Sequence, residues 1–435
     1  MRKMSNSKLC PILSAKVMAQ SREELPVIIQ FNKNSSNLKE NISNLSTKIK
    51  SNLPLIEGFA GHMTTDIIYK LANSPEVDYI SFDSKVYTLL DIATPTMEAY
   101  FPHEKGYEGE GITVAVIDTG VAPHEDLTRP DNRIIGFKDF VNGKDSPYDD
   151  NGHGTHVAGI IGGNGYASKG KYTGVAPKSN ILGIKALDEN GSGNTSDIIA
   201  ALSYAVETKN KYNTRIINLS LGSPPNNSCQ KDPLCKAAQE AVKNGLIVIT
   251  AAGNSGPNEG TILSPGISSE VITVGAVDDK RTIDPSDDTI ASFSSRGPTK
   301  DGLIKPDIVA PGVNIKSLSN TKLDGYLALS GTSMATPLIS GSVALLLNKN
   351  ANLSPREVKN KIARSCIDLN DSKENQGAGM LNLKILFDDG VQQSGRRKPS
   401  KPSKPPSTTP AFFEGDIFES FLILLIIIFL LDSKI

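Results

Sequence analysis

The chain has 435 residues, of which 38% are hydrophobic and 21% are charged, and its formal net charge is −1. This length allows two or three domains with a large core, and the near-neutral charge gives no reason to expect a nucleic-acid partner. Four cysteines are too few for a disulfide framework. Cys229 and Cys235 are close enough in sequence to form one bridge. Two free thiols are an equally good interpretation, so the redox compartment stays open.

The first 91 residues begin with an unassigned segment, residues 1–20. Its apolar stretch is too short for a secretory signal. Residues 21–91 alternate strand-like and helix-like patterns, which predicts a small α+β domain. The expected strands are residues 27–31, 55–63, 77–82 and 86–89, and the expected helices are residues 38–49 and 65–72.

From residue 92 the pattern changes to α/β. Runs rich in β-branched residues alternate with helical patterns, which predicts a parallel sheet covered by helices on both faces. Residues 92–388 are expected to form this larger domain, with its chemistry at the carboxyl ends of the strands. The expected strands are residues 112–117, 181–184, 216–219, 246–249 and 271–274, and the expected helices are residues 197–207, 235–243 and one that starts at Ser354.

The C-terminal part begins with a linker rich in Pro, Ser, Lys and Arg, residues 389–416. Residues 417–435 contain the most apolar run of the chain, which predicts a membrane segment. Its eleven most apolar residues, 421–431, rise only about 16 Å as a helix, against a hydrocarbon core of about 30 Å. A helix docked on the larger domain or an oligomer contact is the alternative. The side of the membrane stays open, because the basic residues before the run and a Cys229–Cys235 bridge favour opposite orientations.

The segment Gly-Thr-Ser-Met-Ala-Thr-Pro, residues 331–337, precedes an apolar helical run. A tight turn at the start of a helix presents the Ser333 hydroxyl where backbone N–H groups and the helix dipole point. Pro337 is expected within the first turn, where its missing N–H costs least. Taken alone, Ser333 is most simply a helix N-cap.

Two further motifs supply what a nucleophilic serine needs. Asp118 follows the first buried strand, where an unpaired carboxylate is costly, although a turn-forming Asp before Gly is the simpler interpretation. His153 and His156 lie in the motif DNGHGTHVAG at the expected start of a helix. A serine nucleophile needs a base and a group that orients the base, and Asp118, His153 and Ser333 provide these three types. A metal site at the two histidines lacks a completing ligand motif.

Two strand ends offer groups that bind a peptide. Asn254 follows a strand in a Gly-rich segment, where asparagine usually serves a turn. Its amide also suits the stabilisation of an oxyanion together with the Ser333 backbone N–H. Residues 220–222 offer an exposed backbone edge to which an extended peptide can add as a strand.

Together these motifs resemble the subtilisin-like serine proteases, over residues 92–388 and in the family's order Asp, His, Ser. The resemblance implies an endopeptidase in which Ser333 attacks, His153 transfers the proton and Asp118 orients the imidazole. It implies that Asn254 binds the oxyanion and that His156 is structural. The implied substrate-binding residues are Ser220, Leu221, Gly222, Ala252, Gly253 and Leu263, of which Ala252 and Leu263 are expected to form walls of an apolar specificity pocket.

The resemblance also implies that residues 21–91 are an inhibitory propeptide. Self-cleavage is then expected between Tyr87 and Ala93, with residues 86–90 lying along residues 220–222 as a bound product. The expected partners are protein or peptide substrates, the chain's own prodomain and a membrane.

No cofactor is expected for the chemistry. Many family members bind a structural calcium ion at the loop 163–173, which here carries Asn164 but no carboxylate. Asp145, Asp149 and Asp150 are an alternative cation site, although a solvated acidic loop is the simpler interpretation.

Two other functions are compatible with parts of the pattern. A non-catalytic binding protein of this fold would be favoured by loss of a triad residue, and none is lost. An acid-acting, sedolisin-type enzyme would have Glu in place of the motif histidine, and His153 argues against it.

Overall fold

The computed structural model describes residues 8–18, 24–32, 48–83, 85–88, 96–225, 228–282 and 284–388. The chain divides into two compact units, Met1–Asp388 and Asp389–Ile435. The predicted linker and apolar C-terminal segment therefore lie outside the described residues. Among the residues that are described, no helix is both long and apolar enough to cross a bilayer.

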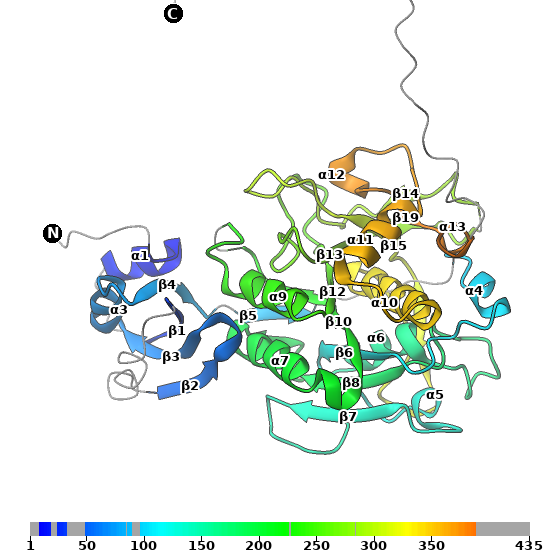
Figure 1. Ribbon diagram of the computed structural model, residues 1–435, viewed down its shortest axis with the longest axis horizontal. Coiled ribbons are helices and arrows are strands. Elements are labelled where there is room, and N and C mark those ends of the chain that lie inside the picture. Colours follow the sequence, from blue (N-terminus) through cyan, green and yellow to red (C-terminus); the bar gives the residue numbers. More distant parts are fainter. Residues whose placement is uncertain are drawn as a thin grey trace, which may run out of the picture. The chain divides into compact units, whose positions relative to one another are not determined.

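Among the described residues, the N-terminal domain has a four-stranded antiparallel sheet and two helices (Figure 1). Leu13 and Val17 of one helix and Ile68 and Leu71 of the other are buried in one cluster on the sheet. Ile28 and Leu53 of this domain are buried in a different cluster, which also contains residues from 198–205 and 234–241 of the larger domain. In sheet order the strands are β2 (Lys48–Leu53), β3 (Gly58–Thr64), β1 (Glu24–Phe31) and β4 (Val77–Phe82), and the helices are α1 (Pro11–Met18) and α3 (Thr65–Ala72).

Three predictions for this domain need correction. The expected helix 38–49 lies mostly outside the described residues, but it is wrong at Ile49, which pairs with Gly61 in β2. The expected strand 55–63 starts as a 3₁₀ turn, η1 (Pro54–Ile56), because Pro54 lacks the N–H that a sheet needs. The unassigned N-terminal residues include α1, and the Cys10 N–H before it donates to the Ile80 carbonyl at 3.1 Å.

The larger domain is built on a ten-stranded, mostly parallel sheet (Figure 1). All five predicted strands are present, and the other five strands of this sheet, β7, β14, β15, β18 and β19, were not predicted. The sheet order is β18 (Cys366–Ile367), β19 (Met380–Leu381), β15 (Ile308–Pro311), β13 (Ile272–Asp278), β12 (Ile247–Ala251), β10 (Thr214–Leu219), β6 (Thr113–Asp118), β8 (Asn180–Lys185) and β7 (Ile134–Asp139), with β14 (Thr289–Ile290) paired to β13.

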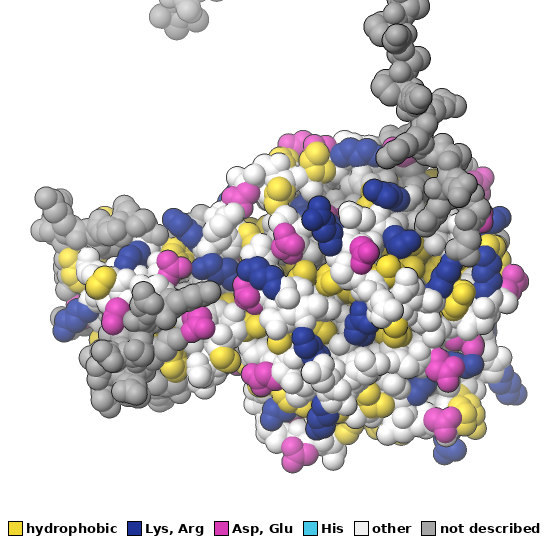
Figure 2. Space-filling model, in the orientation of Figure 1, with side chains coloured by type: hydrophobic (Ala, Val, Ile, Leu, Met, Phe, Trp, Pro, Cys, Tyr) yellow, Lys and Arg dark blue, Asp and Glu magenta, His cyan; other side chains and the backbone are white. Residues whose placement is uncertain are grey.

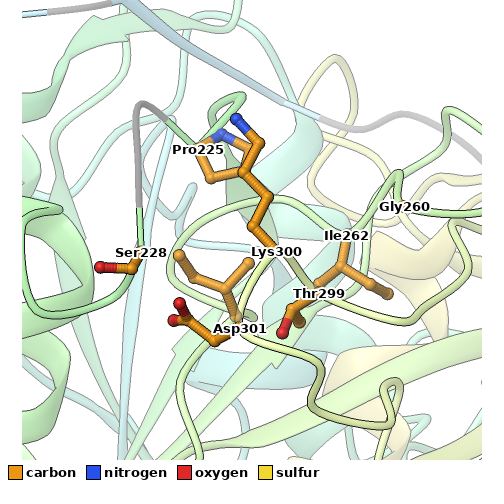
Figure 3. A pocket seen from close by; sticks show the side chains of 8 residues that line it. Pro225, Ser228, Gly260, Ile262, Thr299, Lys300 and Asp301 are labelled. Carbon is orange, nitrogen blue, oxygen red and sulfur yellow. The ribbon is translucent and has the colours of Figure 1, made fainter.

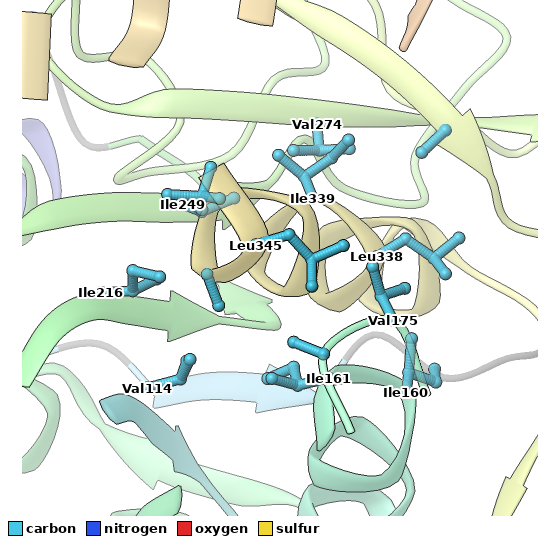
Figure 4. Packing of buried hydrophobic residues seen from close by; sticks show 14 of the residues in the cluster. Val114, Ile160, Ile161, Val175, Ile216, Ile249, Val274, Leu338, Ile339 and Leu345 are labelled. Carbon is cyan, nitrogen blue, oxygen red and sulfur yellow. The ribbon is translucent and has the colours of Figure 1, made fainter. Parts of the chain in front are cut away.

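Helices cover both faces of this sheet, as predicted. Alternate residues of β10 point to opposite faces, since Ile216 belongs to the cluster of α6 (His153–Gly162) and α10 (Thr332–Lys349), and Ile217 to that of α7 (Thr195–Glu207) and α9 (Pro233–Lys243). Figure 4 shows Leu338 and Ile339 of α10 packed beside α6 and the sheet. The smaller elements are α4 (Tyr100–Glu104), α5 (Glu125–Thr128), α8 (Lys209–Tyr212), β16 (Ile315–Leu318), β17 (Tyr326–Leu329), α11 (Pro355–Arg364), α12 (Lys373–Gln376) and α13 (Leu383–Phe387).

Two local features agree with the sequence. Helix α11 starts with a capping box between Ser354 and Glu357, which confirms the predicted helix start. On the face drawn in Figure 2, Lys and Arg side chains are interspersed with Asp and Glu side chains.

Candidate active site

Asp118 is the last residue of β6 and His153 is the first residue of α6. The His153 Nδ1 lies 2.7 Å from Asp118 Oδ1, and neither side chain is exposed. The same carboxylate oxygen accepts the Thr119 N–H at 2.7 Å. This arrangement orients the imidazole and assigns Nδ1 to the carboxylate, so that Nε2 is the nitrogen suited to proton transfer.

The glycine-rich sequence around His153 is required by close packing. A β-carbon on Gly154 would lie 2.1 Å from the Gly120 carbonyl oxygen and 3.0 Å from Asp118 Cβ, so no larger residue fits. The start of α6 is fixed by Asp149, whose carboxylate accepts the Gly152 N–H at 2.8 Å and the Thr155 N–H at 2.9 Å. The strand end and the helix start are thereby held together.

His156 points away from this pair. Its Nε2 lies 3.2 Å from the Ile315 carbonyl oxygen, and complete burial lowers its pKa to about 3, so the ring stays neutral. The two histidines thus have different partners. No group of three or more His, Cys, Asp or Glu that could hold a metal occurs in the described part of the chain.

Ser333 is the second residue of α10, and its hydroxyl donates to the Ser220 carbonyl at 3.0 Å. Pro337 is the sixth helical residue, so the prediction that it lies in the first turn is wrong. A proline there removes the N–H that would bond the Ser333 carbonyl. The Ser220 hydroxyl donates to that carbonyl at 2.8 Å instead, which explains how the helix tolerates the proline.

Asn254 lies beside the start of α10. Its Oδ1 accepts the Thr332 N–H and the Thr332 hydroxyl, each at 3.0 Å. Both bonds use the oxygen, so the Nδ2 group is left to donate elsewhere, and it has no acceptor among the described residues. The Ser333 N–H, in the first turn of the helix, also has no intrahelical acceptor. Together these donors suit a developing oxyanion.

The peptide-binding edge predicted at residues 220–222 is paired with a strand from the N-terminal part of the chain. Strand β11 (Leu221–Gly222) pairs antiparallel with β5 (Lys85–Thr88), so that Gly222 lies opposite Tyr87. Strand β9 (Ser192–Asn194) pairs with the other edge of β5. The prediction that residues 86–90 lie along residues 220–222 is therefore confirmed for Tyr87 and Thr88, the residues of this segment that pair with β11. Residues 89–95, which include most of the range predicted for cleavage, Tyr87 to Ala93, lie outside the described residues.

Sequence reasoning missed β9. Its three residues, Ser-Gly-Asn, lack apolar alternation, because the strand binds through backbone groups rather than through a buried side. The available signal was the loop's position just after strand β8, at the carboxyl edge where chemistry was expected.

Three predicted pocket residues come together. A β-carbon on Gly222 would lie 2.9 Å from Leu263 Cβ, and one on Gly253 would lie 2.7 Å from Leu263 Cγ. Leu263 therefore packs closely against the backbones of both glycines. Ala252 is fully buried in a cluster with Cys229 and Cys235.

Cys229 and Cys235 form a disulfide, so the bridge is present and the alternative of two free thiols is wrong. Between them, Asp232 accepts the Ser264 hydroxyl at 2.6 Å, next to Leu263. A pocket of about 10 Å³ beside this segment is large enough for only about one water molecule (Figure 3). It is lined by Pro225, Ser228, Gly260, Ile262, Ile267, Thr299, Lys300 and Asp301.

Three of the four calcium candidates, Asn164, Asp149 and Asp150, have protein partners. Asn164 Nδ2 donates to the Arg129 carbonyl at 2.6 Å, so the amide serves the loop itself. Asp149 caps α6, and Asp150 pairs with Lys185 Nζ at 2.6 Å.

Comparisons with known proteins agree on one family. Residues 109–380 match the subtilase family, and residues 18–89 match peptidase inhibitor I9. The chain is 40% identical to serine protease AprX of Bacillus subtilis (strain 168) over 390 residues, which cover 83% of this chain and 88% of AprX. It is 37% identical to subtilisin DY of Bacillus licheniformis over 294 residues, 66% of this chain and 95% of the relative. The solved structure of sphericase is similar, with a TM-score of 0.56 and 33% identity over 63% of this chain and 92% of sphericase.

Proposed function

Since the chain belongs to the subtilase family and is a subtilisin-like serine protease with an I9 inhibitory propeptide domain, we propose that Asp118, His153 and Ser333 are its catalytic triad. The observation that carries this proposal is the buried 2.7 Å contact between Asp118 Oδ1 and His153 Nδ1. The family hydrolyses peptide bonds, and the reaction follows from this geometry.

Ser333 Oγ exchanges its bond to the Ser220 carbonyl for one to His153 Nε2 and attacks the peptide carbonyl carbon. His153 takes the hydroxyl proton, and the Asp118 carboxylate stabilises the resulting imidazolium. The oxyanion accepts hydrogen bonds from Asn254 Nδ2 and the Ser333 N–H. The C–N bond then breaks, His153 returns the proton to the leaving amine, and water hydrolyses the acyl-enzyme by the reverse sequence.

The N-terminal domain is proposed to block this site until the chain cuts itself between Tyr87 and Ala93. Strand β5 lies between β9 and β11, where an extended substrate would pair. A product-like strand in this position inhibits because it uses the same backbone groups as a substrate.

The C-terminal segment is proposed to tether the protease. This proposal rests on the apolar run of residues 417–435 and the linker before it. The full chain should sediment with membranes and resist carbonate extraction, whereas a chain ending at Asp388 should stay in solution with unchanged specific activity. A full-length protein that stays in solution without detergent would contradict the tether.

The triad is tested with Ser333→Ala in the full chain. Wild-type protein should gain the mass of a fluorophosphonate adduct at Ser333 and hydrolyse a peptide substrate. The variant should do neither and should keep its circular dichroism spectrum. Labelling of the variant at the normal rate would overturn the assignment.

A further inference from the structure

Ser220 and Ser333 hold each other through two reciprocal hydrogen bonds. The Ser333 hydroxyl donates to the Ser220 carbonyl at 3.0 Å, and the Ser220 hydroxyl donates to the Ser333 carbonyl at 2.8 Å. The first bond holds the nucleophile's side chain, and the second holds its backbone. Both residues are fully buried.

The second bond is needed because the helix itself supplies no donor to the Ser333 carbonyl. In a regular α-helix the residue at position 337 would donate its N–H to the Ser333 carbonyl. Pro337 has no N–H, so the donor comes from outside the helix. The first turn of α10 is thus tied to the chain immediately before β11, the strand that pairs with an extended peptide.

The contact continues into the core. Asn218 Nδ2 donates to the Ser220 hydroxyl oxygen at 2.9 Å, and the Ser340 hydroxyl donates to Asn218 Oδ1 at 2.8 Å. Asn218 lies in β10, level with Val116 and Ile249 on the neighbouring strands. A buried amide between apolar strands is costly unless its hydrogen bonds are made, and this network makes them.

The network holds α10 at two heights. Ser333 and Ser340 are seven residues apart, which is about two helical turns, so they lie on the same face of the helix. Ser220 and Asn218 are two residues apart at the end of β10. Two attachments along one face resist both sliding and rotation of the helix against the sheet.

We propose that Asn218, the Ser220 hydroxyl and Ser340 form a positioning network that keeps the Ser333 nucleophile in register with the peptide-pairing strand. This rests on the proposed role of Ser333 as nucleophile. Ser220 joins the two parts of the reaction, because its side chain holds the nucleophile's helix and its backbone leads directly into β11. A displacement of about 1 Å between nucleophile and substrate costs on the order of 10²-fold in rate, so a loose helix should lower turnover more than binding.

The test compares three variants of the full chain with a matched control. Ser220→Ala removes the donor to Ser333, Ser340→Ala removes the outer attachment, and Ser220→Thr keeps the hydroxyl. The control, Ser342→Ala, removes a buried hydroxyl of the same helix that donates only to the Leu338 carbonyl, at 2.7 Å. After self-processing, active sites are counted by fluorophosphonate labelling, and kcat and KM are measured with a peptide anilide.

Per labelled site, kcat should fall about 10- to 100-fold in Ser220→Ala and about 3- to 10-fold in Ser340→Ala, with KM within about 2-fold of the wild type. Ser220→Thr should regain most of the lost kcat, and Ser342→Ala should match the wild type. The stoichiometry of labelling should stay complete.

The proposal is overturned by a raised KM at unchanged kcat, by an equal loss in Ser342→Ala, or by a Ser220→Thr enzyme as slow as Ser220→Ala. If the Ser220 variants do not fold, Ser340→Ala decides, and an unchanged kcat overturns the proposal. Failure of the triad assignment has a different signature, namely normal labelling of Ser333→Ala.

Discussion

Asp83 of the N-terminal domain caps helix α7 of the larger domain through Ser196. Its carboxylate accepts the Ser196 N–H at 2.8 Å and the Ser196 hydroxyl at 2.6 Å. Lys50, from the same domain, lies beside this pair and contacts Asp197 at 2.8 Å. The propeptide domain thus supplies the acceptor that the first turn of α7 needs, and in the proposed self-processing this acceptor would leave with the domain.

Replacing Asp83 should weaken inhibition. In Asp83→Ala the Ser196 N–H and hydroxyl lose their buried acceptor, which typically costs about 1–3 kcal/mol, or roughly 10- to 100-fold in propeptide affinity. Protease activity should therefore appear earlier after self-processing, as measured with a fluorogenic peptide. Asp78→Ala is the matched control, because Asp78 is exposed and lies 3.5 Å from Lys236. If activity appears at the same time in the two variants, Asp83 does not contribute to propeptide affinity.

The same carboxylate should make propeptide binding depend on pH. Burial raises the pKa of Asp83 in the complex above its ordinary value of 3.8, so forming the complex takes up a proton. This contribution to affinity is fully present below pH 3.8 and is lost as pH rises through the raised pKa. The test uses a Ser333→Ala chain that is cut by an added protease between residues 88 and 96. The dissociation constant of its N-terminal domain from the larger domain should rise over this pH range. In Asp83→Asn the dissociation constant should rise less steeply with pH. An unchanged slope would show that other groups cause the pH dependence.

Asn254→Ala should lower kcat by about 10²- to 10³-fold with little change in KM, because its Nδ2 bonds the oxyanion more strongly than the ground-state carbonyl. Steady-state kinetics on a peptide anilide measures both constants. Asn258→Ala, an exposed substitution in the same loop, should behave as the wild type. An unchanged kcat in Asn254→Ala would leave Asn254 with only its structural bonds to Thr332.

Leu263→Ala should widen the specificity pocket. The side chain fills the space between the Gly222 and Gly253 backbones, so shortening it should favour large aromatic residues at the substrate position just before the scissile bond. The ratio of kcat/KM for a Phe substrate to that for an Ala substrate should rise about 10-fold or more, because a single methylene in a hydrophobic pocket is worth about 1–3 kcal/mol. Ile262→Val, in the neighbouring buried cluster, is the control. An unchanged ratio would place the pocket elsewhere.

The sequence predicted the residues of the candidate site better than the arrangement that supports them. Asp118, His153 and Ser333 lie in local motifs whose glycines and helix starts leave a readable pattern. Strand β9 and the Asp83 cap depend on contacts between residues far apart in sequence, so no periodicity marks them. Pro337 was placed wrongly because helix rules assume an intrahelical donor, and here Ser220 supplies it from a different element.

The pairing of β5 on both edges implies that this protease selects substrates by conformation as well as by side chain. Strands β9 and β11 accept a segment only if the backbone groups of both its edges are available. A strand within a folded sheet has at least one edge already paired, and a helix has none to offer. A native protein must therefore open locally before it is cut. The opening free energy of the segment around the scissile bond then enters kcat/KM directly, so well-ordered proteins, including the mature enzyme itself, should be spared.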